Sequence, residues 1–314
     1  METIGIIGSG MIGISLAALF TGNGYSTLLF VRNAAKIELC QVRYDAIFGQ
    51  LEAHGRLTRT EATVCSSYLK IVNDYRDLSE AAYVFECIAE DLAAKHDVLV
   101  SLERHCPDVR VIASTTSALS ADDVVTGLTE LRGRFIVAHP FNPPHLVPCV
   151  EVVRGTQTTD ETVKAVVSLL QSVGRVVTIL NRNVPGFIGN RLQYALLREA
   201  MYLIDTGVAT AADIDTILQN SLMPRYTAIG LFEHQDNAGL DLIKKVGEYL
   251  LPALNNDTRF PIWLLDKVEA GDLGVKTGRG VYEWDAERVF DLNERILEPF
   301  EVHWQIPKSS FNDL

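Results

Sequence analysis

A histidine and a glutamate near the middle of this 314-residue chain are well suited to acid–base chemistry. His139 follows a short apolar run and precedes a proline-rich stretch, and Glu151 lies within the apolar run 150–153. A lone carboxylate is costly to bury among apolar residues, so Glu151 needs a partner. A strand hairpin from 139 to 151 would supply His139. The carboxylate would then fix the tautomer and basicity of an imidazole that removes a hydroxyl proton.

A glycine-rich turn near the N-terminus is the second chemical signal. Residues Gly8, Ser9, Gly10, Met11, Ile12 and Gly13 fit the pattern G-x-G-x-x-G between a strand-like run and a helical pattern. In such a turn Gly8 allows the tight bend, Gly10 lets the backbone approach a pyrophosphate, and Gly13 lets the helix pack on the strand. These six residues predict a dinucleotide site. A glycine turn that merely precedes a helix is the alternative.

The residues after the second strand bear on which dinucleotide binds. In a pocket for NAD, an acidic residue there would accept hydrogen bonds from the ribose, but Val31 holds that position. Arg32, Asn33 and Lys36 follow, and a guanidinium can donate two parallel hydrogen bonds to a phosphate. We therefore expect a nicotinamide cofactor, with NADP(H) favoured over NAD(H). The alternative is a solvated Arg32 that stacks on adenine and accepts either cofactor.

The elements that must position these residues alternate between strand-like and helical patterns. Strand-like runs occur at 4–8, 28–31, 83–88, 111–113, 135–138, 150–153 and 176–180. The alternation predicts an α/β fold, with a Rossmann-type doubly wound sheet domain over residues 1–183 and an inserted helical hairpin at about 34–70. Only helical patterns follow, which predicts an all-α C-terminal domain over 184–314.

Composition limits the classes of partner. The chain has 28 basic and 40 acidic residues, and its net charge of -12 argues against nucleic acid. No apolar run of about 18 residues could span a membrane, and the N-terminus lacks the order of a signal peptide. We expect a cytoplasmic protein with a small-molecule substrate and no membrane partner. The five scattered cysteines have no metal-ligand spacing, which predicts reduced thiols and no metal site.

Several motifs together resemble the L-3-hydroxyacyl-CoA dehydrogenase family, with its 3-hydroxybutyryl-CoA dehydrogenase and lambda-crystallin-like branches. Besides the glycine turn, these motifs lie at 86–90, 114–117, 139–143, 185–191 and 276–282. Their order and spacing cover nearly the whole chain. The resemblance implies an NAD(P)-dependent oxidoreductase of fatty acid metabolism that acts on CH–OH and interconverts 3-hydroxyacyl and 3-oxoacyl groups. It also implies a homodimer and a role for the helical domain in substrate binding and dimerisation.

The resemblance also implies a role for each matching residue. His139 would be the general base in oxidation and the acid in reduction, and Glu151 would orient it. Ser117 and Asn190 would hydrogen-bond the reacting oxygen or its neighbour, and Asn142 would brace its loop beside the substrate. The hydride would pass between C3 of the substrate and C4 of the nicotinamide. Local structural roles for the polar residues, such as a helix cap at Ser117, are the alternative. The implied cofactor contacts are Ile88, Glu90, Lys95, Ser117 and Asn142.

Two departures from the family pattern concern cofactor and substrate. The family is commonly NAD-dependent, whereas Val31 and Arg32 replace the acidic residue. In CoA users the hairpin supplies lysines to the CoA tail, yet residues 37–62 contain no lysine. The stretch 223–226 resembles branches that act on free hydroxy acids, such as gulonate and carnitine dehydrogenases, and Arg225 could bind a substrate carboxylate or form a salt bridge between helices. A free 3-hydroxy-acid dehydrogenase is therefore the alternative to a CoA enzyme, and a non-catalytic crystallin-like protein is a third.

Overall fold

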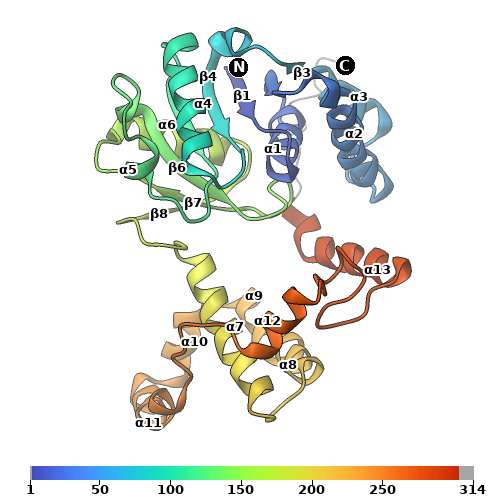
Figure 1. The fold of residues 1–314 in the computed structure, drawn as a ribbon, viewed down its shortest axis with the longest axis vertical. Helices are drawn as coiled ribbons and strands as arrows, with labels where there is room; N and C mark the ends of the chain where they lie inside the picture. Colours follow the sequence, from blue (N-terminus) through green and yellow to red (C-terminus); the bar gives the residue numbers. More distant parts are fainter. Residues whose placement is uncertain (1, 304–314) are drawn as a thin grey trace. The chain divides into compact units, whose positions relative to one another are not determined.

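The computed structural model describes residues 2–303, which divide into two compact units (Figure 1). The first unit comprises residues 2–188 together with 295–303, and the second comprises residues 189–294. The chain therefore passes from the first unit to the second after Ile188 and returns to the first unit at Arg295.

An eight-stranded sheet forms the centre of the first unit, with the strand order β3-β2-β1-β4-β5-β6-β7-β8. All neighbouring strands are parallel except β6 and β7, which are antiparallel. The strand order reverses beside β1, so the switch point of a doubly wound sheet lies between β1 and β4. The expected Rossmann-type fold is confirmed. The strands are β1 (Thr3–Ile7), β2 (Thr27–Phe30), β3 (Leu69–Val72), β4 (Ala81–Glu86), β5 (Val111–Ser114), β6 (Phe135–Pro140), β7 (Cys149–Val153) and β8 (Val176–Leu180).

Helices cover the sheet through two separate apolar cores. One core contains Phe20, Tyr44 and Phe85, and the other contains Leu99 and Val124. Successive strand residues alternate between the two cores because side chains of a strand point to opposite faces. The helices of this unit are α1 (Met11–Gly22), α2 (Ile37–Ala53), α3 (Arg59–Ser67), α4 (Leu92–His105), α5 (Ala121–Val124) and α6 (Asp160–Ser172).

Residues 34–70, which we expected to be helical, contain α2 and α3 but end in a strand. Leu69 begins β3, which pairs in parallel with β2 and forms one edge of the sheet. Only Val72 of this four-residue strand is fully buried, and Lys70 is exposed. A short strand with such mixed burial has neither a continuous apolar run nor a clear alternation, so its sequence resembles the end of a helix.

The second unit is helical, as expected for the C-terminal domain. Its first long helix follows Ile188, and Thr210 and Asp213 form a capping box at the start of α8. None of the described helices is long and apolar enough to cross a membrane. The helices are α7 (Gly189–Asp205), α8 (Ala211–Ile217), the π-helix η4 (Leu218–Leu222), α9 (Met223–Ala228), α10 (Leu231–Ala238), α11 (Leu240–Leu250), α12 (Ile262–Glu269) and α13 (Ala286–Leu297), which ends within the first unit.

Candidate active site

Strands β6 and β7 bring His139 and Glu151 together. Their antiparallel pairing places His139 directly opposite Glu151, and Nδ1 of His139 lies 2.9 Å from Oε2 of Glu151. Both side chains are buried. Because a carboxylate only accepts hydrogen bonds, Nδ1 of His139 is the donor, and in the neutral imidazole Nε2 carries the lone pair. The hairpin thus gives the imidazole one defined tautomer.

Two aromatic rings and a backbone amide also lie beside this pair. The ring centroids of Phe141 and Phe187 lie 5.2 and 5.4 Å from that of His139. The backbone N–H of Ile188 donates to Oε1 of Glu151 at 2.8 Å, so both carboxylate oxygens have partners. Phe187 is completely buried and has a φ of 50°, which is unusual for a residue with a side chain. The motif at 185–191 located this segment, but nothing in the sequence indicated that it contacts His139.

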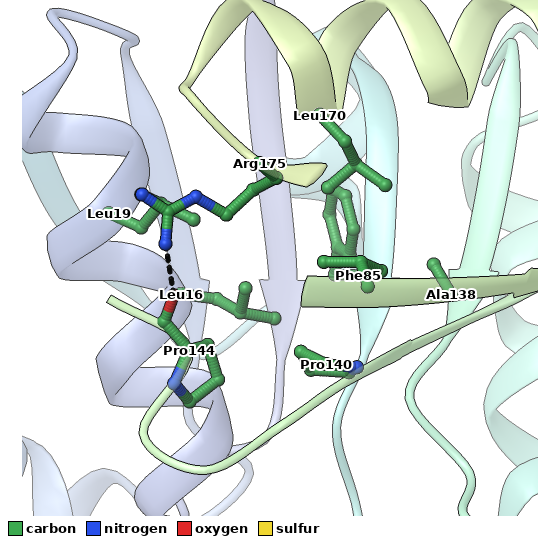
Figure 2. Close-up of a pocket in the computed structure, with 9 residues that line it drawn as sticks. Leu16, Leu19, Phe85, Ala138, Pro140, Pro144, Leu170 and Arg175 are labelled. Carbon is green, nitrogen blue, oxygen red and sulfur yellow. Dashed lines mark hydrogen bonds between the residues drawn. The ribbon is translucent and has the colours of Figure 1, made fainter. Parts of the chain in front are cut away.

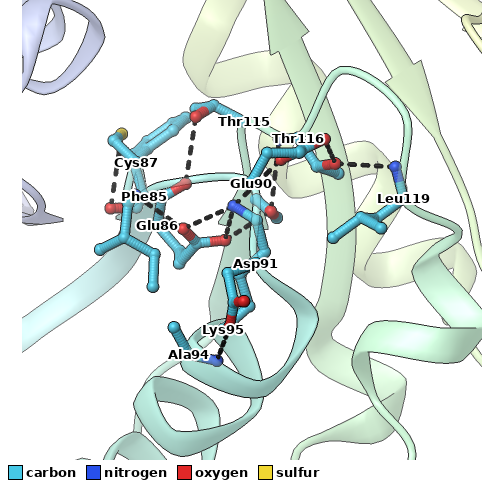
Figure 3. Close-up of polar contacts among 12 residues, drawn as sticks. Phe85, Glu86, Cys87, Glu90, Asp91, Ala94, Lys95, Thr115, Thr116 and Leu119 are labelled. Carbon is cyan, nitrogen blue, oxygen red and sulfur yellow. Dashed lines mark hydrogen bonds and ion pairs between the residues drawn. The ribbon is translucent and has the colours of Figure 1, made fainter.

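A buried ion pair lies where β4 and β5 end (Figure 3). Nζ of Lys95 is 2.9 Å from Oε1 of Glu86, and both side chains are buried. The Ser114 hydroxyl donates to Oε2 of Glu86 at 2.6 Å, and the backbone N–H of Ile88 donates to Oε1 at 2.8 Å. A buried charge pair needs such additional hydrogen bonds to offset its desolvation, and here both carboxylate oxygens receive them.

Glu90 connects the ion pair to the turn that carries Ser117. Its Oε2 lies 3.6 Å from Nζ of Lys95, while its Oε1 accepts hydrogen bonds from the Thr116 hydroxyl and from the backbone N–H of Ser117. Burial alone would raise the pKa of Glu90, but Thr116, Lys95 and the backbone donors together lower it. We expected Lys95 itself to contact the cofactor. Its ammonium group is buried between the carboxylates of Glu86 and Glu90, so Lys95 also supports the turn at Ser117 through Glu90.

A pocket of about 430 Å³ opens beside the glycine turn. A Cβ at Gly10 would meet no atom within 4 Å, so the backbone is open there. Gly10 is also the N-cap of α1 and has no side chain to occupy the free N–H groups of the first turn. An open helix N-terminus of this kind fits a phosphate group, and the residues present therefore fit a dinucleotide. Several of the residues predicted to contact the cofactor line this pocket, namely Gly8, Ser9, Val31, Arg32, Asn33, Lys36 and Ile88.

The basic end of this pocket is formed by exposed side chains. Arg32 and Lys36 are exposed, whereas the side chain of Val31 is buried. Asn33 accepts a hydrogen bond from the backbone N–H of Ala35 and so caps a short helical turn. Arg32 and Lys36 are therefore the cations that this pocket offers to an anionic ligand.

The remaining expected residues fall in both units. Met11, Ser117 and Asn142 of the first unit have exposed side chains, whereas Ile12 packs on the core. Asn190 is the second residue of α7, and Arg225 lies on α9, so both belong to the second unit. Nη1 of Arg225 donates to Nε2 of His234 on α10 at 2.6 Å, so its partner is an imidazole and not a carboxylate. Among the described residues, no group of three His, Cys, Asp or Glu side chains could hold a metal ion.

A doubly wound sheet with a dinucleotide pocket at the carboxyl ends of its strands defines a nucleotide-dependent enzyme class. Comparison with known families then identifies the branch of that class. The NAD binding domain of 3-hydroxyacyl-CoA dehydrogenase matches residues 3–183, and the C-terminal domain of 3-hydroxyacyl-CoA dehydrogenase matches residues 186–284. The chain therefore belongs to the 3-hydroxyacyl-CoA dehydrogenase family, a family of NAD-dependent oxidoreductases that act on CH–OH, as the sequence motifs predicted.

Individual relatives span two kinds of substrate. The chain is 30% identical over 289 residues to the 5-formyl-3-hydroxy-2-methylpyridine 4-carboxylate 5-dehydrogenase of Mesorhizobium japonicum, covering 92% of both chains. It is 30% identical over 286 residues to a probable 3-hydroxybutyryl-CoA dehydrogenase of Bacillus subtilis, covering 91% of this chain and 98% of that protein. A solved structure of a 5-formyl-3-hydroxy-2-methylpyridine 4-carboxylic acid 5-dehydrogenase, described as an NAD+ dependent dismutase, has a TM-score of 0.87 at 28% identity and covers 96% of this chain and 97% of that chain.

Proposed function

We propose that this protein interconverts 3-hydroxyacyl and 3-oxoacyl groups, in the manner of a 3-hydroxyacyl-CoA dehydrogenase, with His139 as the acid–base group. The observation that carries the proposal is the 2.9 Å contact between Nδ1 of buried His139 and Oε2 of buried Glu151. In oxidation, Nε2 of His139 accepts the proton of the substrate hydroxyl, and Glu151 stabilises the resulting imidazolium. In reduction, Nε2 returns that proton to the developing alkoxide.

The other residues of the proposed site orient the reactants. Glu90 holds the turn at Ser117, whose hydroxyl is exposed to hydrogen-bond the reacting oxygen. Asn190 shares this role, and Asn142 contacts substrate and cofactor from the loop that follows β6. The bound nicotinamide supplies the hydride acceptor in oxidation and the hydride donor in reduction. The main contribution of the protein to the hydride transfer is then to hold the hydride donor and the hydride acceptor in the correct relative orientation.

Replacing the proposed base tests this function directly. His139→Gln should lower kcat by about 10²–10⁴-fold with 3-oxoacyl substrates, because the amide cannot transfer the proton. Cofactor affinity, measured by fluorescence titration, should stay within about threefold of wild type. The matched control is His54→Gln, which alters a histidine at the end of α2 and should keep full turnover. Unchanged turnover in His139→Gln would show that another group carries the proton.

For the cofactor, we propose that NADP(H) is favoured over NAD(H). Arg32 and Lys36 line the pocket after β2, and Val31 stands where a carboxylate would repel a 2′-phosphate. The ratio of kcat/KM for NADPH to that for NADH should exceed one in wild type and fall about tenfold or more in Arg32→Ala, which removes a charge-assisted contact. Arg43→Ala, an exposed arginine of α2 outside the pocket, should leave the ratio unchanged. A preference for NADH that Arg32→Ala does not alter would exclude the proposal, and the solved relative is described as NAD+ dependent.

A free 3-hydroxy carboxylic acid is the second candidate substrate. It is favoured by the exposed guanidinium of Arg225, by the lack of lysine in residues 37–62, and by a relative that acts on a pyridine carboxylate. Arg225→Ala should lower kcat/KM about 10²-fold for free 3-oxo acids and leave 3-oxoacyl-CoA esters unaffected. Arg259→Ala, another exposed arginine of this unit, is the control. Equal rates in Arg225→Ala and wild type would exclude the carboxylate contact, and cofactor binding without turnover of either class would favour a crystallin-like role.

We further propose that the second unit forms a homodimer. Met201 is the only large apolar side chain of residues 189–294 that is buried within this chain. A helical unit of this size needs an apolar core, and a second copy of the same unit would provide one.

A further inference from the structure

The loop at residues 141–148 joins β6 to β7 and so connects His139 to Glu151. It carries Asn142 and then turns inward, where residues 144–147 are buried. Buried backbone groups of a loop need hydrogen-bond partners, because no ladder of a sheet supplies them. The N–H groups of Leu146 and Val147 donate to the carbonyl of Pro143 within the loop. Side chains of two residues outside the loop provide partners for the remaining N–H of His145 and for the carbonyls of Pro144 and Val147.

Ser15 of α1 contacts His145 of this loop twice. Its hydroxyl accepts the backbone N–H of His145 at 3.0 Å and lies 2.7 Å from Nδ1 of the same residue. Since the hydroxyl accepts the first bond, its own proton is available to donate to Nδ1. Burial, together with the charge of Arg175, lowers the pKa of His145 to about 4. The imidazole is therefore neutral near pH 7, as an acceptor at Nδ1 requires.

Arg175 lies just before β8 and provides the second set of contacts (Figure 2). Its Nη1 donates to the backbone carbonyls of Pro144 and Val147, at 3.1 and 3.3 Å. The residue is only 5% exposed, and no carboxylate among the described residues forms an ion pair with it. Burial lowers the pKa of Arg175 only to about 10, so it stays charged. Its hydrogen bonds to the loop are charge-assisted and correspondingly strong.

We propose that Ser15, His145 and Arg175 are positioning residues that hold the loop at 141–148 for the reaction. Because α1 begins at the glycine turn, the bond from Ser15 to His145 connects the dinucleotide-binding helix directly to the loop that follows the proposed base. Arg175 fixes the buried part of the same loop through two of its carbonyls. The inference rests on the proposed function for its catalytic meaning, whereas the contacts themselves do not depend on it.

Hydrogen exchange of the apo protein tests whether these contacts hold the loop. In Ser15→Ala and in Arg175→Met, the amides of residues 145–147 should exchange at least about tenfold faster than in wild type, while those of β4 and β5 keep their rates. Two matched controls should leave the loop unchanged. Thr21→Val removes another buried hydroxyl of α1, which contacts Tyr44, and Arg134→Met removes a guanidinium that donates to the carbonyls of Pro107 and Val109. Wild-type exchange of the loop in Ser15→Ala and Arg175→Met would overturn the proposal, whatever reaction the protein catalyses.

Kinetics then separate positioning from mere stability. In both variants kcat should fall about tenfold or more at a temperature where the protein is fully folded, while the dissociation constant of the cofactor changes less than about threefold. The pH dependence of kcat should keep its shape, because His139 and Glu151 are still paired. Unchanged kcat with a lowered Tm would reduce these residues to a structural role and overturn the inference. Absence of turnover in wild type would contradict the proposed function instead, and loop exchange would still decide whether the contacts hold the loop.

Discussion

At the scale of single residues, the buried ion pair of Glu86 and Lys95 is the contact of the site whose loss we expect to cost the most stability. Removing one partner of a buried ion pair leaves an uncompensated charge, which costs about 3–5 kcal/mol. Lys95→Met should therefore lower the free energy of unfolding by roughly that amount, measured by urea denaturation. Lys244→Met, which breaks the exposed pair of Lys244 and Glu248, should cost less than about 1 kcal/mol.

The double variant Glu86→Gln with Lys95→Met identifies the cause of that loss. With both charges gone, no charge is buried without a partner, and much of the lost stability should return. If the double variant is as unstable as the sum of the two single variants, packing of the lysine chain, and not its charge, stabilises this region.

His145 makes a second residue-level prediction, which concerns pH. Its pKa is about 4 in the folded protein, against an ordinary value of 6.5, so between these values the unfolded chain binds more protons. The free energy of unfolding should consequently fall as pH is lowered from about 6.5 to about 4, by up to about 3 kcal/mol from this group. His145→Phe removes the group, so the stability difference between wild type and variant, measured in urea at pH 7 and pH 4.5, should shift in favour of the variant at the lower pH. Parallel pH profiles would contradict the prediction.

At the scale of elements, two glycines of the turn before α1 have separable roles. A Cβ at Gly13 would lie 1.9 Å from the carbonyl oxygen of Gly8, so Gly13→Ala must displace α1 from β1. A Cβ at Gly10 would meet nothing within 4 Å, so Gly10→Ala should fold normally and obstruct only the approach of a pyrophosphate. We expect Gly13→Ala to lower Tm by several degrees, and Gly10→Ala to keep the wild-type Tm while weakening cofactor binding about tenfold or more. Thermal unfolding and fluorescence titration measure the two effects, and equal loss of Tm in both variants would contradict this division.

The sequence was most informative where a local pattern determines an element. The glycine turn, the alternation of strands and helices, and the hairpin that pairs His139 with Glu151 all follow from periodicity and residue type within short windows. Strand β3 was not predicted, because its mixed burial leaves neither a continuous apolar run nor a clear alternation in the sequence. The contact of Phe187 with His139 and the contacts of Arg175 with Pro144 and Val147 join segments far apart in the chain, which no local pattern reports.

At the scale of the whole molecule, the second unit leaves many of its large apolar side chains exposed. On α11, Leu242, Val246 and Tyr249 follow one another at helical spacing and are 50%, 50% and 88% exposed. On α10 and α12, Phe232 and Ile262 are 80% and 74% exposed. Single exposed apolar residues are ordinary, but stripes on successive helices are typical of an interface.

The last prediction concerns a dimer in which these stripes are buried. Wild-type protein at micromolar concentration should have twice the monomer mass by light scattering, and its Tm should rise with concentration because unfolding is coupled to dissociation. Val246→Glu combined with Tyr249→Glu places two charges on the stripe of α11 and should yield monomer with a lowered Tm, since the second unit then loses its covering surface. Lys244→Glu with Lys245→Glu reverses two charges on the same helix at positions that are already polar, and should leave the mass unchanged. A monomeric wild type would mean that the apolar stripes of the second unit are covered by something other than a second copy of this chain.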